Sequence, residues 1–209
     1  MAQPRLLVCG FDAFPDAPVN PSAAVVRALA AEGWSPAGAA LDCEAIPVAW
    51  SGSLEAILQR GAYDGVLVVG VAVEAEAFRV ETLGRNRADP DRPDHAGHRW
   101  PTPEIDPAGP PALPATAPVE AILARLAAAG LAADFSDDAG AYLCNFTLYG
   151  LLAARAAPAV GFLHVPQARE CAADARFTLA DIDRAVRLSL DAFAEALASR
   201  VELLDAVEP

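Results

Sequence analysis

Short apolar segments alternate along this chain with segments whose apolar residues recur at helical spacing, and this alternation is the strongest constraint on the fold. Residues 65–69 read Gly-Val-Leu-Val-Val, a continuous run typical of a strand covered on both faces. Further strands are predicted at residues 5–9, 41–46, 132–135 and 159–163. Helices are predicted at residues 22–32, 53–59, 118–129, 142–154 and 178–201. Strands that alternate with helices predict an α/β fold with a mostly parallel, twisted sheet and helices on both faces.

Several helices carry recognisable start and stop signals. The expected N-caps are Asn20, Ser53, Thr116 and Thr178. Pro21 in the first turn and Gly33 after the last periodic residue delimit the first helix. Asp181 completes a capping-box pattern at the start of the last helix. The apolar stripe of that helix consists of Ile182, Val186, Leu190, Phe193, Leu197 and Val201.

The size of the chain suits one domain spanning residues 1–209, which we expect to be a three-layer sandwich. No apolar run reaches the roughly 18 residues of a membrane span, and residues 1–10 lack the apolar core of a signal peptide. A net charge of -13 argues against nucleic acid or an anionic membrane surface as a partner, since both attract clustered Lys and Arg. We therefore expect a cytoplasmic protein.

Residues 85–116 differ in character from the rest of the chain. This segment contains eight prolines and two of the three histidines. Proline lacks a backbone N–H and disrupts both helices and central strands, so no regular element is predicted here. A structureless stretch of this length inside a compact domain is usually functional or disordered. We interpret it as a mobile loop that acts as a flap.

One cysteine stands out among four. The cysteines are Cys9, Cys43, Cys144 and Cys171. Their wide spacing, without a Cys-x-x-Cys pair, favours neither a zinc site nor a disulfide framework, so we expect reduced thiols and no metal. Cys144 follows a loop containing Gly140 and falls near the start of a predicted helix, where backbone N–H groups favour a thiolate and can hold an oxyanion. A buried structural cysteine would fit the same position.

A candidate base and a candidate orienting acid are less distinct. His164 follows the predicted strand at residues 159–163, and open α/β sheets place their sites at the carboxyl ends of strands. It is the natural base for an activated cysteine, because His95 and His98 lie in the Pro-rich segment. Glu81 lies in a short stretch with strand-like alternation, but spacing alone does not select it from 28 acidic residues.

Four blocks of the sequence, taken in order, resemble one known family. They read Gly10-Phe-Asp-Ala-Phe-Pro-Asp-Ala-Pro-Val-Asn-Pro-Ser22, Glu81-Thr-Leu-Gly-Arg-Asn86, Ala139-Gly-Ala-Tyr-Leu-Cys-Asn145 and Gly161-Phe-Leu-His-Val-Pro166. These blocks are similar in order and spacing to those of pyroglutamyl peptidase I, also called pyrrolidone-carboxylate peptidase, a family of cysteine peptidases. The resemblance extends over nearly the whole chain.

The resemblance implies an omega peptidase that hydrolyses the amide bond after an N-terminal L-pyroglutamyl residue of peptides. Cys144 would form a thioester acyl-enzyme, His164 would transfer protons, and Glu81 would orient the imidazole. The positions that correspond to the walls of the lactam pocket are Phe11, Phe14, Tyr142 and Leu143. The resemblance also implies a homo-oligomer, commonly a homotetramer, that needs no metal or cofactor.

Two departures from the family pattern bear on these expectations. The family usually has a Gly-Gln-Ala-Gly-Gly-Arg type turn after the third strand, whereas this chain reads Gly70-Val-Ala-Val-Glu-Ala75. The family also has an oxyanion-stabilising arginine ten residues after the glutamate, where this chain has Asp91. Arg92 is the expected replacement and Arg87 the weaker alternative. The altered turn leaves two other readings open: the same triad with altered N-acyl or cyclic amide specificity, or a non-catalytic lactam-binding homologue.

Overall fold

The elements found in a computed structural model of the chain follow the predicted alternation. The structure describes residues 3–14 and 19–205, with the side chains of residues 201–205 excepted. The strands are β1 (Arg5–Phe11), β2 (Ala40–Ile46), β3 (Gly65–Val71), β4 (Phe78–Glu81), β5 (Leu83–Arg85), β6 (Ala112–Pro114), β7 (Ala133–Ser136) and β8 (Ala159–Val165). The helices are α1 (Pro21–Glu32), α2 (Trp50–Leu58), α3 (Val119–Ala128), α4 (Leu143–Ala153) and α5 (Leu179–Asp205).

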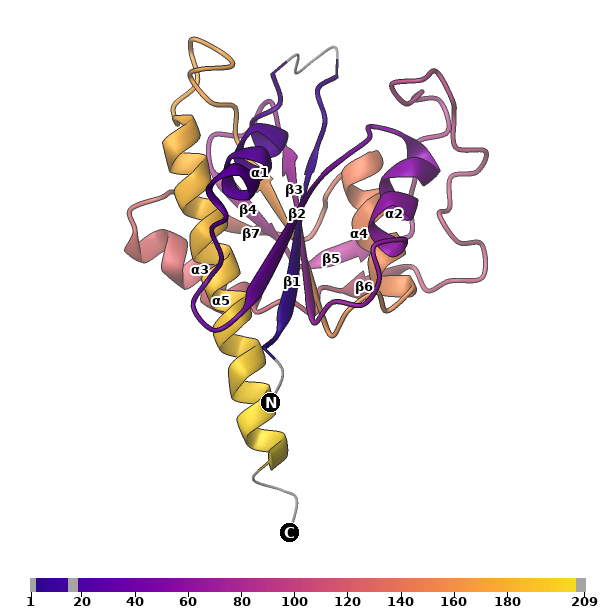
Figure 1. The fold of residues 1–209 in the computed structure, drawn as a ribbon. Coiled ribbons are helices and arrows are strands. Elements are labelled where there is room, and N and C mark those ends of the chain that lie inside the picture. The colour runs from indigo at the N-terminus through magenta and orange to yellow at the C-terminus, as the bar shows by residue number, and fades with distance from the viewer. Residues whose placement is uncertain (1–2, 15–18, 206–209) are drawn as a thin grey trace.

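The main sheet has the strand order β2-β1-β3-β8-β4-β7. All of its pairings are parallel except that between β8 and β4, which is antiparallel. Helices α1, α3 and α5 cover one face, and α2 and α4 cover the other (Figure 1). The predicted fold class, a three-layer α/β sandwich with a mostly parallel sheet, is therefore confirmed.

Two apolar clusters fill the space between the sheet and its helices. Alternate residues of β1 point to opposite faces, so that Leu6 and Val8 enter one cluster while Leu7 and Cys9 enter the other. The apolar stripe of α5 enters the same cluster as Leu6. Its described members are Ile182, Val186, Leu190, Phe193 and Leu197. Burial of this stripe explains why a long helix with charged outer residues forms here.

Capping occurs where the sequence predicts it at α1 and α5. The Asn20 Oδ1 accepts the Ser22 N–H at 3.1 Å, and Gly33 ends the helix with a φ of 63°. The Thr178 N–H donates to the Asp181 carboxylate at 2.8 Å, and the Asp181 N–H returns a bond to the Thr178 hydroxyl. These reciprocal bonds make up a capping box.

The predicted caps Ser53 and Thr116 are wrong. Helix α2 already begins at Trp50, and the buried Ser53 hydroxyl lies 2.9 Å from the Thr147 hydroxyl of α4 instead. The Thr116 hydroxyl accepts the Val160 N–H at 2.8 Å, so it satisfies strand β8 rather than helix α3. In both cases a tertiary partner satisfies a group that local sequence assigns to a helix end.

The Pro-rich segment contains a strand, contrary to the prediction that residues 85–116 form no regular element. Strand β6 pairs antiparallel with β5, and Leu83 lies opposite Pro114 in the register. Both strands of a two-stranded sheet are edge strands, and part of the N–H groups of an edge strand face away from the partner strand. Proline, which has no N–H, is tolerated at such a position.

Within the described residues, no helix combines the length and the apolar character needed to cross a membrane.

Candidate active site

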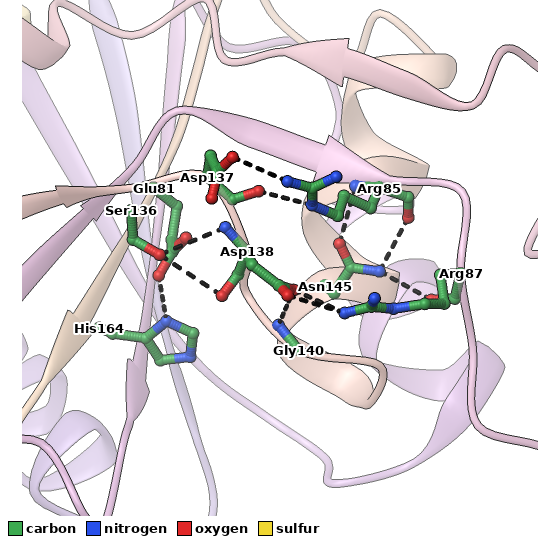
Figure 2. Close-up of polar contacts among 9 residues, drawn as sticks. All are labelled: Glu81, Arg85, Arg87, Ser136, Asp137, Asp138, Gly140, Asn145 and His164. Carbon is green, nitrogen blue, oxygen red and sulfur yellow. Dashed lines mark hydrogen bonds and ion pairs between the residues drawn. The ribbon is translucent and has the colours of Figure 1, made fainter.

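Glu81 and His164 are joined by the one antiparallel pairing of the main sheet. Glu81, the last residue of β4, lies opposite Phe162 of β8, so His164 is its diagonal neighbour on the same face. The His164 Nδ1 donates to the Glu81 Oε1 at 2.7 Å, because a carboxylate can only accept (Figure 2). This bond leaves Nε2 of the imidazole available for a proton transfer.

Both members of this pair are buried, and their surroundings favour a protonated imidazole. Glu81 is 1% exposed and His164 is 7% exposed. Burial lowers the pKa of His164, but the charge of a Cys144 thiolate and hydrogen bonds from His164 to Cys144 and Glu81 outweigh it. The net effect raises the pKa of His164 from 6.5 to about 9.

Cys144 is the second residue of α4 and stands against Gly70 of β3. The first helical hydrogen bond is donated by the Phe146 N–H to the Tyr142 carbonyl. The N–H groups of the three preceding residues therefore have no acceptor within the helix. A Cβ added to Gly70 would stand 3.1 Å from the Cys144 Sγ, so glycine at this position makes room for the sulfur. Gly70 also pairs with His164 in the sheet register.

A cavity of about 450 Å³ opens over Cys144 and His164. All four positions expected to form the lactam pocket lie on its wall. They are Phe11, Phe14, Tyr142 and Leu143. Arg92 and residues 71–75, the turn that departs from the family pattern, also line it. The structure thus brings all the expected site residues except the buried Glu81 to the wall of one cavity, whose size suits a small ligand.

Arg92 reaches the cavity across the ring of Tyr142. The Arg92 guanidinium carbon lies 4.0 Å from the centroid of that ring, a cation–π contact. The Tyr142 hydroxyl donates to the Pro93 carbonyl at 3.0 Å, which fixes the backbone beside Arg92. Arg87, the alternative candidate, is engaged elsewhere, since its guanidinium binds the Asp138 carboxylate at 2.7 Å.

The loop that leads into α4 is held by ion pairs that sequence reasoning missed. Figure 2 shows Arg85 binding Asp137 and Arg87 binding Asp138. The Asp138 carboxylate also accepts the Gly140 N–H at 2.9 Å. Partial burial raises the pKa of Asp138, but the Gly140 N–H and the Arg87 guanidinium outweigh it and lower the pKa below its ordinary value. These contacts fix the approach to the helix that carries Cys144.

Asn145, the residue after Cys144, holds helix α4 in place by hydrogen bonds, a role that could not be predicted from the sequence. It is fully buried, and its Oδ1 accepts the Arg85 N–H at 2.8 Å. Its Nδ2 donates to the carbonyls of Arg85 and Arg87 (Figure 2). One side chain therefore ties α4 to β5 and to the start of the Pro-rich segment. No local spacing signals this role, because the partners lie about 60 residues away.

The Pro-rich segment is attached to the body of the protein at its middle as well. The buried carboxylate of Asp94 accepts the N–H groups of Trp50, Ala96 and His98 at 3.2, 2.9 and 2.9 Å. It thereby caps α2, whose own N-cap residue supplies no side chain bond. Trp100 packs against Trp50 as well. The mobility of residues 85–116 stays a prediction. A movement of this segment would either leave the contacts of Asp94 and Trp100 intact or break them.

The other thiols differ from Cys144 in their surroundings. All four cysteines are free, as the sequence predicts. Burial raises the pKa of Cys9 and of Cys171, and raises that of Cys43 to about 11. In the part of the chain that the structure describes, no three His, Cys, Asp or Glu side chains gather as a metal site would require.

Similarity to known proteins extends over almost the entire chain. The sequence profile described as pyroglutamyl peptidase matches residues 4–202. The pyrrolidone-carboxylate peptidase of Gloeobacter violaceus is 34% identical over 168 residues, covering 78% of this chain and 81% of that protein. That of Cupriavidus pinatubonensis is 32% identical over 210 residues, covering 95% of each.

The same similarity holds in three dimensions. A mutant pyrrolidone carboxyl peptidase from the hyperthermophile Pyrococcus furiosus matches this structure with a TM-score of 0.85 at 27% identity. The match covers 92% of this chain and 99% of that one. The relatives found by sequence and the neighbour found by structure therefore carry the name of the same peptidase.

Proposed function

This chain belongs to the pyroglutamyl peptidase family, and we propose that it hydrolyses the amide bond after an N-terminal L-pyroglutamyl residue of peptides. The observation that carries the proposal is the placement of Cys144 and His164 on the wall of one cavity, with the buried Glu81 hydrogen-bonded to the His164 imidazole. A thiol, a base and an orienting carboxylate are the parts that acyl transfer to a cysteine requires.

The reaction begins with attack of the Cys144 sulfur on the carbonyl carbon of the amide bond that follows the pyroglutamyl ring. His164 accepts the proton of the thiol, and its raised pKa suits it to hold that proton. As the C–N bond breaks, the imidazolium gives the proton to the leaving amine, and a thioester to Cys144 remains. Water, deprotonated by His164, then cleaves the thioester and releases pyroglutamate. Glu81 holds the imidazole by its Nδ1 throughout.

Two groups are positioned to stabilise the oxyanion of this reaction. The N–H groups in the first turn of α4 lack helical acceptors, and they point from the end of the helix that carries Cys144. We assign the second contribution to the Arg92 guanidinium, which lines the same cavity. The sequence departs from the family spacing here by one residue, and the contact of Arg92 with Tyr142 supports Arg92 over Arg87.

The lactam ring of pyroglutamate is small, flat and uncharged, and the cavity wall suits it. Phe11, Phe14, Tyr142 and Leu143 offer aromatic and aliphatic surface beside the nucleophile. The turn at residues 71–75 also lines the cavity and lacks the polar residues of the family pattern. That observation favours a second candidate, the same triad acting on another N-acyl or cyclic amide.

The proposal extends to the setting of the enzyme. The reaction as written needs no metal or cofactor, because the protein itself supplies nucleophile, base and oxyanion donors. We place the protein in the cytoplasm, with peptides rather than nucleic acid or membrane as its partners, as a homo-oligomer and specifically a homotetramer by family resemblance. Size-exclusion chromatography with light scattering tests the assembly.

The activity is tested by incubating the purified protein with pyroglutamyl p-nitroanilide and, in parallel, with prolyl p-nitroanilide. Release of nitroaniline from the first alone, abolished by Cys144→Ala, supports the proposal. Cleavage of other N-acyl anilides in preference to the pyroglutamyl one would support the second candidate. Binding of pyroglutamate without turnover of any anilide would instead identify a non-catalytic lactam-binding protein.

A further inference from the structure

A second, larger cavity of about 830 Å³ lies beside the first. Three residues of the turn after β3 line both cavities: Val73, Glu74 and Ala75. The second cavity is completed by Pro166 and Gln167, which follow strand β8, and by residues between 171 and 176. The two cavities are therefore neighbours on either side of this turn or along it, with residues 73–75 as their common wall.

The chemistry of the proposed reaction indicates which part of a peptide extends there. His164 protonates the leaving amine, so the peptide beyond the scissile bond must depart on the side of the imidazole. Pro166 and Gln167, two and three residues after His164 along the chain, line the second cavity. The first cavity, with its aromatic wall, holds the lactam. The second is therefore placed to hold the residues that follow pyroglutamate.

The charge of the second cavity is unbalanced. Glu74, Glu76 and Asp174 line it, against a single cation, Arg176. All four side chains lie at the surface. None of the three carboxylates takes part in an ion pair with any residue that the structure describes. The net charge of -13 on the whole chain adds a field of the same sign, which attracts cationic groups.

The cavity also offers contacts for a peptide that do not depend on charge. Val19 and Val73 on its wall are large apolar side chains that remain 51% and 41% exposed. The Gln167 Oε1 is buried, and within the described residues it has no hydrogen-bond donor. Gln167 lines the cavity, and a side-chain amide can both donate to and accept from a peptide backbone.

From these observations we infer that the second cavity is the leaving-group subsite of the enzyme and that it favours peptides with Lys or Arg directly after pyroglutamate. The inference rests on the proposed function. Glu74, which lines both cavities, is placed to meet the first residue after the scissile bond, with Glu76 and Asp174 available to the next. The aliphatic stem of a lysine or arginine can lie along Val73 while its charged end meets these carboxylates.

The test compares kcat/KM for three amidated peptides: pyroglutamyl-Lys-Lys, pyroglutamyl-Ala-Ala and pyroglutamyl-Glu-Glu. At low ionic strength the lysine peptide is expected to exceed the glutamate peptide by about tenfold or more. The double variant Glu74→Gln/Glu76→Gln should reduce this ratio to about twofold, because two of the carboxylates that attract the cationic peptide lose their charge. Salt at 0.5 M should reduce the wild-type ratio in the same way.

The matched control is Glu55→Gln, which removes one exposed carboxylate on α2 outside both cavities. It lowers the negative charge of the chain and should leave the ratio close to that of the wild type. Equal kcat/KM for all three peptides, or an unchanged ratio in the double variant, would overturn the inference while the proposed function stands. Failure to hydrolyse even the alanine peptide would overturn both.

Discussion

Gly70 and Cys144 lie so close that a Cβ on residue 70 would stand 3.1 Å from the Cys144 Sγ and 2.7 Å from the Cζ of Phe162. Phe162 in turn packs on His164, with ring centroids 4.7 Å apart. A single added methyl group would therefore push on the nucleophile and on the ring that supports the base. Gly70 is therefore required by the site and not by strand β3, because glycine weakens a strand.

Gly70→Ala is accordingly expected to lower kcat/KM by about 100-fold, because small displacements of reacting groups are costly. The control is Gly65→Ala on the same strand, where a Cβ would stand 2.7 Å from Leu6 and 2.8 Å from Phe193 in the core. Both variants should lose about 1–3 kcal/mol of unfolding free energy through overpacking. Urea denaturation and kinetics on a pyroglutamyl anilide separate the two effects. Equal activity of the two variants would contradict the role of Gly70.

Cys144 is expected to be the first thiol alkylated near neutral pH. Burial raises the pKa of Cys9, Cys43 and Cys171, and with a pKa of about 11 only roughly one Cys43 in 10,000 is a thiolate at pH 7. Brief treatment with iodoacetamide followed by mass-spectrometric mapping measures the order of labelling. The variant Cys144→Ala should abolish turnover while keeping the fold, since alanine favours helices. Faster labelling of Cys43 or Cys171 would count against Cys144 as the nucleophile.

Loss of the base is expected to be more severe than loss of its orienting acid. His164→Ala removes the group that transfers protons, whereas Glu81→Gln keeps the shape of the side chain. The glutamine can donate to Nδ1 and hold the imidazole in the tautomer whose Nε2 already bears a proton. We expect Glu81→Gln to lower kcat by about 10³–10⁴-fold, and His164→Ala to lower it further. Near wild-type activity of Glu81→Gln would move the orienting role to another carboxylate.

The ionisation of His164 offers a test that does not depend on turnover. The largest cause that raises its pKa to about 9 is the charge of the Cys144 thiolate. NMR titration of the imidazole should therefore find a lower pKa in Cys144→Ala than in the wild type. Only three histidines contribute signals, so assignment by substitution is practical. An identical pKa in the two proteins would show that the sulfur and the imidazole do not interact.

The same shift predicts how stability depends on pH. The pKa of His164 is higher in the folded state than its ordinary value of 6.5, so proton binding favours the folded state. This contribution is complete below about pH 6.5 and is lost as the pH rises to about 9. The difference in unfolding free energy between wild type and His164→Gln should narrow over that interval. If the difference in unfolding free energy between the two proteins stayed constant with pH, the pKa of His164 would not be raised in the folded state.

Much of the fold could be predicted because it depends on local patterns. The continuous apolar run of β3 and the stripe of α5 each identify their element without reference to the rest of the chain. Cys144 could be singled out from a glycine loop followed by a helix. The Glu81–His164 contact could not be predicted in this way. The two residues are 83 positions apart in the sequence, and their contact depends on the antiparallel register of β4 and β8. For the same reason the ion pairs of Arg85 and Arg87 were missed, as their partners come from another part of the chain.

The last prediction concerns residues 85–116, which we expect to behave as a flap that becomes more ordered on ligand binding. Arg92 lies on this segment, and its neighbour Asp94 fixes the backbone through three hydrogen bonds. Trypsin can cut after the exposed Arg99, close to this anchor. Cutting there in the free protein should slow when a pyroglutamyl aldehyde occupies the site. Arg155, exposed after α4, provides an internal cleavage site that the inhibitor should not affect.

Two variants separate a working flap from an inert insertion. Asp94→Ala removes the anchor and should speed cleavage after Arg99 by about tenfold or more, because three N–H groups lose their acceptor. Arg92→Ala should lower kcat more than it weakens binding of a pyroglutamyl ligand, since an oxyanion contact is made mainly in the transition state. Cleavage that a saturating inhibitor leaves unchanged, together with a fully active Arg92→Ala, would show that the segment is a passive insertion. Slower cleavage with an impaired Arg92→Ala would instead show that it closes over the substrate and delivers Arg92 to the oxyanion.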